Sequence, residues 1–172
     1  MKLNGVHWLE EQVAEQVAEF GNLKDEEKSE IIDFCMLWSF FEGRYLNENG
    51  NVNSIREFAT KFEKNGGFTK LKLDECVKYF VDRYVADGEF THSHESLYLE
   101  KSGNPPEVNQ MLKEVSSTTS EKLIGCLVII YRFRNNLFHG VKWQYNFLGQ
   151  LDNFTHANKL LMKLMQLGQP NN

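Results

Sequence analysis

The chain has 172 residues, of which 41% are hydrophobic and 13% aromatic, which is enough to bury a core and excludes a disordered protein. Its net charge of −5 argues against a broad surface for binding nucleic acid. No apolar run approaches membrane-spanning length, and the start, MKLNGVHWLEEQ, lacks the apolar stretch of a secretory signal, so we expect one domain over residues 1–172 of a cytoplasmic protein without membrane contact.

Apolar residues recur at helical spacing along most of the chain, and no segment alternates convincingly as a strand would. The pattern predicts helices at about 7–20, 25–46, 53–64, 72–86, 107–115, 118–140 and 147–166, of which the one at 107–115 is short. Residues 88–106 are polar and end in Asn104-Pro105-Pro106, which predicts a loop. We therefore expect an all-α fold, a single helical bundle domain of about five or six helices, with two long hydrophobic helices at its centre.

Two helix starts carry specific signals. Acidic residues at 25–27 suit the positive N-terminal end of the second helix. Thr118 and Glu121 have the spacing of a capping box, directly before the apolar run from Leu123 to Tyr131. The helix that follows should end at Gly140, a typical C-terminal glycine.

Cysteines and clustered histidines give little support to a metal site or a disulfide. Cys35, Cys76 and Cys126 are odd in number, widely spaced and set among apolar helix positions, which favours reduced core residues. His92 and His94 could supply two metal ligands, but no second cluster completes a site. We expect neither a metal nor a cofactor.

Charged residues fall on the apolar faces of two predicted helices. At about 100° per residue, Arg134 lies within an apolar stripe of its helix, whereas Arg132 points roughly 160° away from Arg134. Glu42 likewise lies on the apolar face of the helix at 25–46. Because an isolated buried charge costs several kcal/mol, we expect Glu42 to contact Arg134. Such a contact fits either a structural salt bridge or a carboxylate that orients Arg134 toward an anionic ligand.

Polar residues that could act on a ligand surround Arg134. Asn135 and His139 are four residues apart and share a helix face beside the stripe. His139 lies one residue before Gly140, where it either complements the helix dipole or transfers protons near neutral pH. Residues 122–151 contain no Asp or Glu, so this part of an acidic protein is locally basic.

The sequence Arg134-Asn135-x-x-x-His139, late in an all-α chain and at the end of a long apolar helix, resembles the signature of the HEPN superfamily. The stretch LWSFFE at 37–42 also resembles the early helix of such domains. The resemblance implies a metal-independent endoribonuclease, in which two copies of the motif face each other in a homodimer. Arg134 would hold the scissile phosphate, His139 would transfer a proton, Asn135 would add a polar contact and Glu42 would position Arg134.

The chemistry that the resemblance implies needs no cofactor, because RNA supplies its own 2′-hydroxyl nucleophile and the products carry a cyclic phosphate or its hydrolysed form. Many such domains belong to toxin–antitoxin or phage-defence systems, so an antitoxin or another protein partner is also implied. Some have lost activity and bind a nucleotide or a protein partner instead. An unrelated helical interaction domain, in which Glu42 and Arg134 form only a structural bridge, is the third interpretation.

A dimer has separate support from the helix at 25–46. Met36 and Phe40 lie opposite its apolar stripe, so the helix is apolar on two sides. This pattern predicts either a helix buried at the centre of the bundle or one that carries an interface. The loop at 88–106 is either a substrate gate or an ordinary connection.

Overall fold

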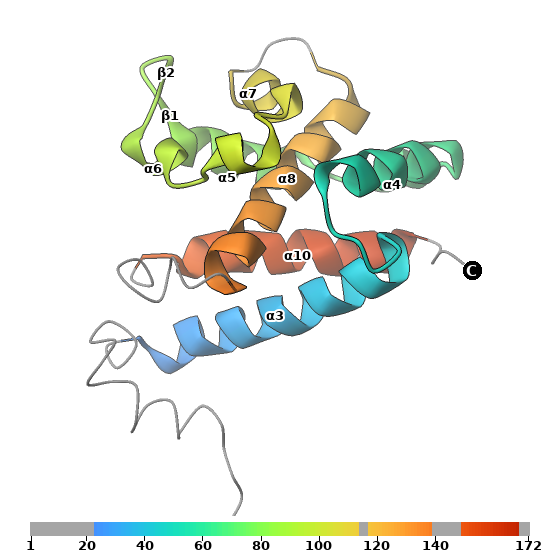
Figure 1. The fold of residues 1–172 in the computed structure, drawn as a ribbon, viewed down its shortest axis with the longest axis horizontal. Helices are drawn as coiled ribbons and strands as arrows, with labels where there is room; N and C mark the ends of the chain where they lie inside the picture. The colour runs from blue at the N-terminus through green and yellow to red at the C-terminus, as the bar shows by residue number, and fades with distance from the viewer. Residues whose placement is uncertain (1–22, 114–116, 139–148, 169–172) are drawn as a thin grey trace, which may run out of the picture.

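The computed structural model describes residues 23–113, 117–138 and 149–168, and most of them are helical (Figure 1). The α-helices are α3 (Asp25–Tyr45), α4 (Val52–Lys64), α5 (Asp74–Tyr84), α6 (His92–Glu95), α7 (Pro106–Leu112), α8 (Thr119–Phe138) and α10 (Leu151–Leu167). Two short 3-10 helices, η1 (Gly67–Thr69) and η2 (Leu99–Ser102), lie between them. The all-α expectation is therefore confirmed, and the helix predicted at about 7–20 lies outside the described residues.

Helix α8 runs through the middle of the molecule. Figure 1 shows α3 and α10 lying side by side, with α8 descending toward them from the end of the molecule that holds α7 and α4. The residues of α8 from Leu123 to Ile130 are all buried. A helix that is apolar on every side in this way is a central core helix, as expected for one of the two long hydrophobic helices.

Side-chain hydrogen bonds cap the N-termini of α8 and α4. The Thr118 backbone N–H donates to Glu121 Oε2 at 2.7 Å, and the Glu121 N–H donates to Thr118 Oγ1 at 3.2 Å, which confirms the predicted capping box. Asn51 caps α4 by accepting hydrogen bonds from the N–H groups of Asn53 and Ser54. These bonds satisfy donors that have no partner within the first turn of a helix.

A short hairpin follows α5 and was not predicted. Strand β1 (Val85–Ala86) pairs antiparallel with β2 (Glu89–Phe90) around Asp87 and Gly88, whose φ angles are 53° and 80°. Two consecutive residues with positive φ form the tight turn that fits a two-residue hairpin, and Asp-Gly is a preferred pair for it. The helix expected at 72–86 therefore ends at Tyr84, where β1 begins. The hairpin has no signal in the sequence pattern, because strands of two residues are too short to show alternation.

The predicted loop at 88–106 is instead an ordered segment that contains β2, α6 and η2. Leu97 and Leu99 are buried in the core. Asn136 of α8 donates to the Ser96 carbonyl at 2.9 Å, and Arg132 Nε donates to the Leu97 carbonyl at 2.8 Å. These attachments to the central helix favour the interpretation of the segment as a fixed connection over that of a gate.

The three cysteines are free thiols, with Cys76 and Cys126 buried and Cys35 half-buried. A hydrogen bond with Cys76, together with burial, raises the pKa of the Cys126 thiol, and burial raises that of Cys35. A raised pKa lowers the fraction of each thiol that is present as reactive thiolate at neutral pH. Across residues 23–113, 117–138 and 149–168, no helix is long and apolar enough to cross a membrane.

Candidate functional site

Glu42 and Arg134 meet where α3 passes the C-terminal end of α8. Glu42 Oε2 lies 3.7 Å from Arg134 Nη2, and the two side chains are 19% and 29% exposed. The predicted contact between them is therefore confirmed. The pair lies at the edge of the bundle, where water and a ligand can reach it.

Two neutral donors hold the Glu42 carboxylate more closely than Arg134 does. Trp38 Nε1 donates to Oε2 at 2.6 Å, and the Gly50 backbone N–H donates to Oε1 at 2.9 Å. A Cβ atom on Gly50 would lie 2.6 Å from Oε1, so only glycine allows this approach. The carboxylate is thereby fixed in position, and its negative charge still faces Arg134.

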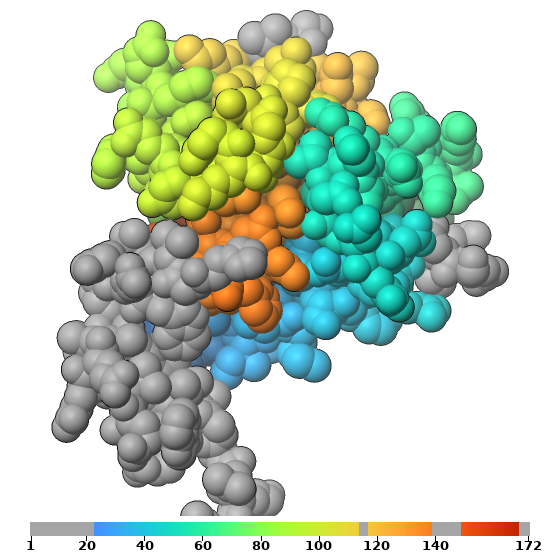
Figure 2. All heavy atoms as spheres, viewed as in Figure 1, coloured from blue at the N-terminus to red at the C-terminus, as the bar shows by residue number. Residues whose placement is uncertain are grey.

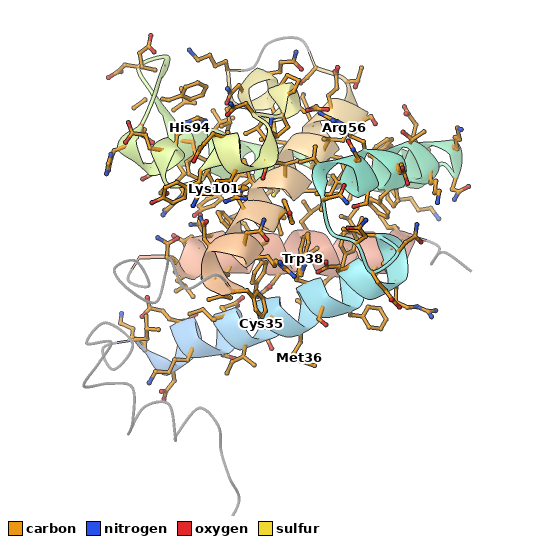
Figure 3. All side chains as sticks on the ribbon, in the orientation of Figure 1. Cys35, Met36, Trp38, Arg56, His94 and Lys101 are labelled. Carbon is orange, nitrogen blue, oxygen red and sulfur yellow. The ribbon has the colours of Figure 1, made fainter. Side chains whose placement is uncertain are left out.

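Trp38 and Gly50 are not among the site residues that the sequence predicts. A signal for Trp38 was present, because it lies four residues before Glu42 on the same helix and its indole N–H needs an acceptor when the ring is buried. Figure 3 shows Trp38 on the side of α3 that faces α8 and α10, with Met36 on the opposite side. The backbone donor from Gly50 had no sequence signal, since it depends on how the chain turns after α3.

Arg134 is held on three sides and remains partly open. Its Nη1 donates to Asn135 Oδ1 at 3.0 Å, and its guanidinium carbon lies 5.3 Å from the centre of the Phe138 ring. With Glu42 on a third side, the guanidinium is restrained, while the Arg134 side chain remains 29% exposed. An arginine held in this way presents paired N–H donors suited to the oxygens of a phosphate or carboxylate.

The helical projection places Arg134, and not Arg132, on the apolar face of its helix, but Arg132 is the more deeply buried of the two. Arg132 is 4% exposed, and its Nη1 donates to Ser102 Oγ at 3.0 Å in addition to the bond with the Leu97 carbonyl. Burial lowers the pKa of Arg132, whereas the charges of Tyr131 and Glu100 act in the opposite direction. Arg134, which was expected inside, is the more open of the two. The projection failed because a helix buried on nearly every side has no apolar stripe that marks the interior.

Of the four predicted site residues, the structure brings together Glu42, Arg134 and Asn135. The Asn135 side chain accepts a hydrogen bond from Arg134 and thereby orients the guanidinium. Because Asn135 is only 8% exposed, a ligand can contact little of it. His139 lies outside the described residues and directly follows the last residue of α8, Phe138.

A polar hollow of about 490 Å³ lies beside this site, between the start of α4, the segment around η2 and the middle of α8. In Figure 2 the orange atoms of α8 are visible between the teal start of α4 and the yellow-green segment that includes η2. Its cations are Arg56 and Lys101, labelled in Figure 3, and Tyr131 provides an aromatic wall. The Tyr131 ring lies 6.0 Å from that of Trp38, so the hollow borders the indole that holds Glu42.

The histidines of α6 are used in local contacts. His92 Nδ1 lies 2.9 Å from Glu95 Oε2, and the His94 ring stacks on Phe90 with centroids 4.0 Å apart. Among the described residues, no three histidine, cysteine or acidic side chains gather as a metal site. Comparisons with protein-family models, curated proteins and solved structures found no match.

Proposed function

We propose that this protein is an endoribonuclease of the HEPN type, which cleaves RNA without a metal through attack of the 2′-hydroxyl on the adjacent phosphate. The observation that carries the proposal is the half-open guanidinium of Arg134, oriented by Glu42 and Asn135 at the helix end that immediately precedes His139. Arg134 binds the scissile phosphate and stabilises the charge that develops on it. His139 exchanges a proton with the 2′-hydroxyl or the leaving oxygen.

A purely structural salt bridge fits the geometry less well. A structural bridge would have its two charged groups as close partners, whereas Glu42 is bonded to Trp38 and Gly50 and lies 3.7 Å from Arg134. The carboxylate thus lowers the cost of placing Arg134 beside the core while the arginine side chain stays 29% exposed. This arrangement suits an arginine that binds an anion and returns to Glu42 when the anion leaves.

The test is cleavage of a single-stranded RNA by purified protein in the presence of EDTA. Arg134→Gln and His139→Ala should each lower the rate by about two to three orders of magnitude, because each removes a group that acts in the transition state. An RNA with 2′-deoxy sugars should remain intact. If wild type and His139→Ala cleave equally, or neither cleaves any RNA, the catalytic proposal is wrong.

The proposed enzyme acts as a homodimer, and the exposed apolar stripe of α3 supports this part of the proposal. Ile32, Met36 and Phe40 follow one another at helical spacing and are 44%, 70% and 56% exposed. Burial at the centre of the bundle, the other explanation for this stripe, does not apply. A second copy of the chain would bury these side chains and bring a second Arg134 and His139 into one assembly.

Sedimentation of the purified protein tests the dimer. Met36→Glu should give a monomer with an unchanged melting temperature and little cleavage activity, since a charge on the stripe cannot be buried against a second copy. Gln110→Glu introduces the same charge on the exposed side of α7 and should leave both assembly and activity as in the wild type. A wild-type protein that is monomeric at the concentration of the cleavage assay would contradict the dimer.

A second candidate is a catalytically silent HEPN module that binds a nucleotide. The hollow beside Trp38 favours it, because the Lys101 ammonium could contact a phosphate oxygen while Tyr131 stacks on a base. This module would bind a mononucleotide equally well in wild type and His139→Ala, would lose affinity in Lys101→Gln, and would cleave no RNA.

A further inference from the structure

A second hollow, of about 390 Å³, is lined by a cluster of lysine side chains. It lies between the chain that enters α5 and the outer face of α10. Four lysines line it together with a single acidic residue: Lys70, Lys72, Lys159 and Lys163 with Glu75. The whole chain has only 19 basic residues against 24 acidic ones, so this concentration is not a consequence of composition.

The positive charges of these lysines have few acidic partners. Lys159 Nζ pairs with Glu75 Oε1 at 3.2 Å, and both side chains are more than half exposed. Within the described part of the chain, Lys70, Lys72 and Lys163 form no ion pair. Lys159 and Lys163 are four residues apart on α10, where like charges repel each other. Such a group of charges is a cost to the folded protein that a bound anion would remove.

The floor and wall of the hollow are ordered. Cys76 and Leu160 are buried beneath it, and His156 lines it one helical turn before Lys159. The His156 ring stacks on Tyr79 with centroids 4.1 Å apart and planes inclined by 10°. Tyr79 is fixed in turn by its hydroxyl, which donates to Asn153 Oδ1 at 2.8 Å. The imidazole therefore has a set orientation at the edge of the lysine cluster.

We propose that this hollow binds a diphosphate group, as inorganic pyrophosphate or as part of a nucleoside diphosphate. Four lysines and one glutamate in the lining leave an excess of positive charge that matches a diphosphate better than a single phosphate. The cavity is large enough for two linked phosphate groups and is open on one side, so a nucleoside could extend from it. This site is separate from Arg134 and does not depend on cleavage of RNA.

His156 serves as the reporter in the test. Burial lowers the pKa of His156, and the positive charge of Lys159 lowers it further, against weaker opposite effects of Glu75 and Asp152. A bound anion adds negative charge beside the ring, so the pKa measured by NMR should rise when pyrophosphate is added. Titrating the full chain with pyrophosphate, ADP and orthophosphate gives the affinity of each from the same signal.

Pyrophosphate should bind at least about tenfold more tightly than orthophosphate, and binding of ADP as well would identify a nucleotide as the source of the diphosphate. The double variant Lys72→Gln, Lys163→Gln should weaken pyrophosphate binding by about tenfold or more and leave the Lys159–Glu75 pair intact. The matched variant Lys61→Gln, Lys64→Gln removes the same charge from α4 and should change the affinity by less than about twofold.

Equal affinity for orthophosphate and pyrophosphate would overturn the proposal, as would an unchanged affinity in the Lys72 and Lys163 double variant. Displacement of pyrophosphate by a single-stranded RNA that carries no diphosphate, at lower concentration than ADP requires, would also overturn it and would indicate a track for the nucleic-acid backbone.

Discussion

Two arginines separated by one residue on α8 are used in opposite ways. Arg132 lies on the side of the helix that faces the 88–106 segment, where it is buried and donates to the Leu97 carbonyl and the Ser102 hydroxyl. Arg134 lies on the side that faces α3, where it is partly exposed beside Glu42. The buried Arg132 therefore holds the fold together, whereas the partly exposed Arg134 is the arginine to which we assign ligand binding in the proposed function.

Substitution of the two arginines tests this comparison most strongly. Arg132→Gln should destabilise the fold by about 2–4 kcal/mol, because it breaks two hydrogen bonds to a charged group and leaves the buried Leu97 carbonyl without its donor. Arg134→Gln should cost less than about 1 kcal/mol, since the pair with Glu42 is long and partly exposed. Urea denaturation of both variants measures the difference. Equal losses of stability would remove the distinction between the two sides of α8.

Substitution of Gly50, the glycine beside Glu42, should give the next largest loss of stability. Gly50→Ala places a Cβ atom 2.6 Å from Glu42 Oε1, so the carboxylate must move, and we expect a loss of about 1–3 kcal/mol and slower RNA cleavage. Gly43→Ala is the matched control on α3, where an added Cβ meets nothing within 4 Å and helix propensity favours alanine. Thermal unfolding and cleavage assays of the pair check both effects. Full cleavage activity in Gly50→Ala would show that RNA cleavage does not depend on the position of the Glu42 carboxylate.

Arg56 extends the comparison to an arginine bound to a carboxylate, with a smaller expected effect. Its Nε donates to Glu107 Oε1 at 2.6 Å, and the side chains are 40% and 12% exposed. Burial raises the pKa of Glu107, but the hydrogen bond and charge of Arg56, with a backbone hydrogen bond, outweigh it and hold the pKa below its usual value.

A carboxylate with a lowered pKa stabilises the fold at neutral pH and loses that contribution as the pH falls through its folded-state pKa. Wild type should therefore lose up to about 1 kcal/mol more than Glu107→Gln between about pH 6 and pH 3, with the exposure of Arg56 limiting the effect. Urea denaturation across that range measures it. Asp82→Asn, in the exposed Lys78–Asp82 pair, should leave the pH dependence close to that of the wild type.

The sequence predicted those features that depend on local spacing. The bounds of α3 and α4, and the capping box of Thr118 and Glu121, follow from helical periodicity and from residues near one another in the chain. The contact of Glu42 with Arg134 was also predicted, since a buried charge on each of two helices requires a partner.

Features that depend on the arrangement of several segments were missed. The burial of Arg132 depends on where the 88–106 segment crosses α8, and no periodicity encodes that crossing. The bond from Gly50 to Glu42 depends on the turn between α3 and α4. The lysines of the second hollow come from two segments that are far apart in the chain, so their concentration becomes visible only after folding.

The position of Gly50 also has a consequence for protein synthesis. Glu42 and both of its closest donors, Trp38 and Gly50, lie within one short stretch that leaves the ribosome long before Arg134 is added. All three residues are therefore present in a nascent chain before the guanidinium that Glu42 contacts has been synthesised. A translation product that stops before residue 134 retains Glu42, Trp38 and Gly50 and lacks the arginine whose guanidinium Glu42 contacts.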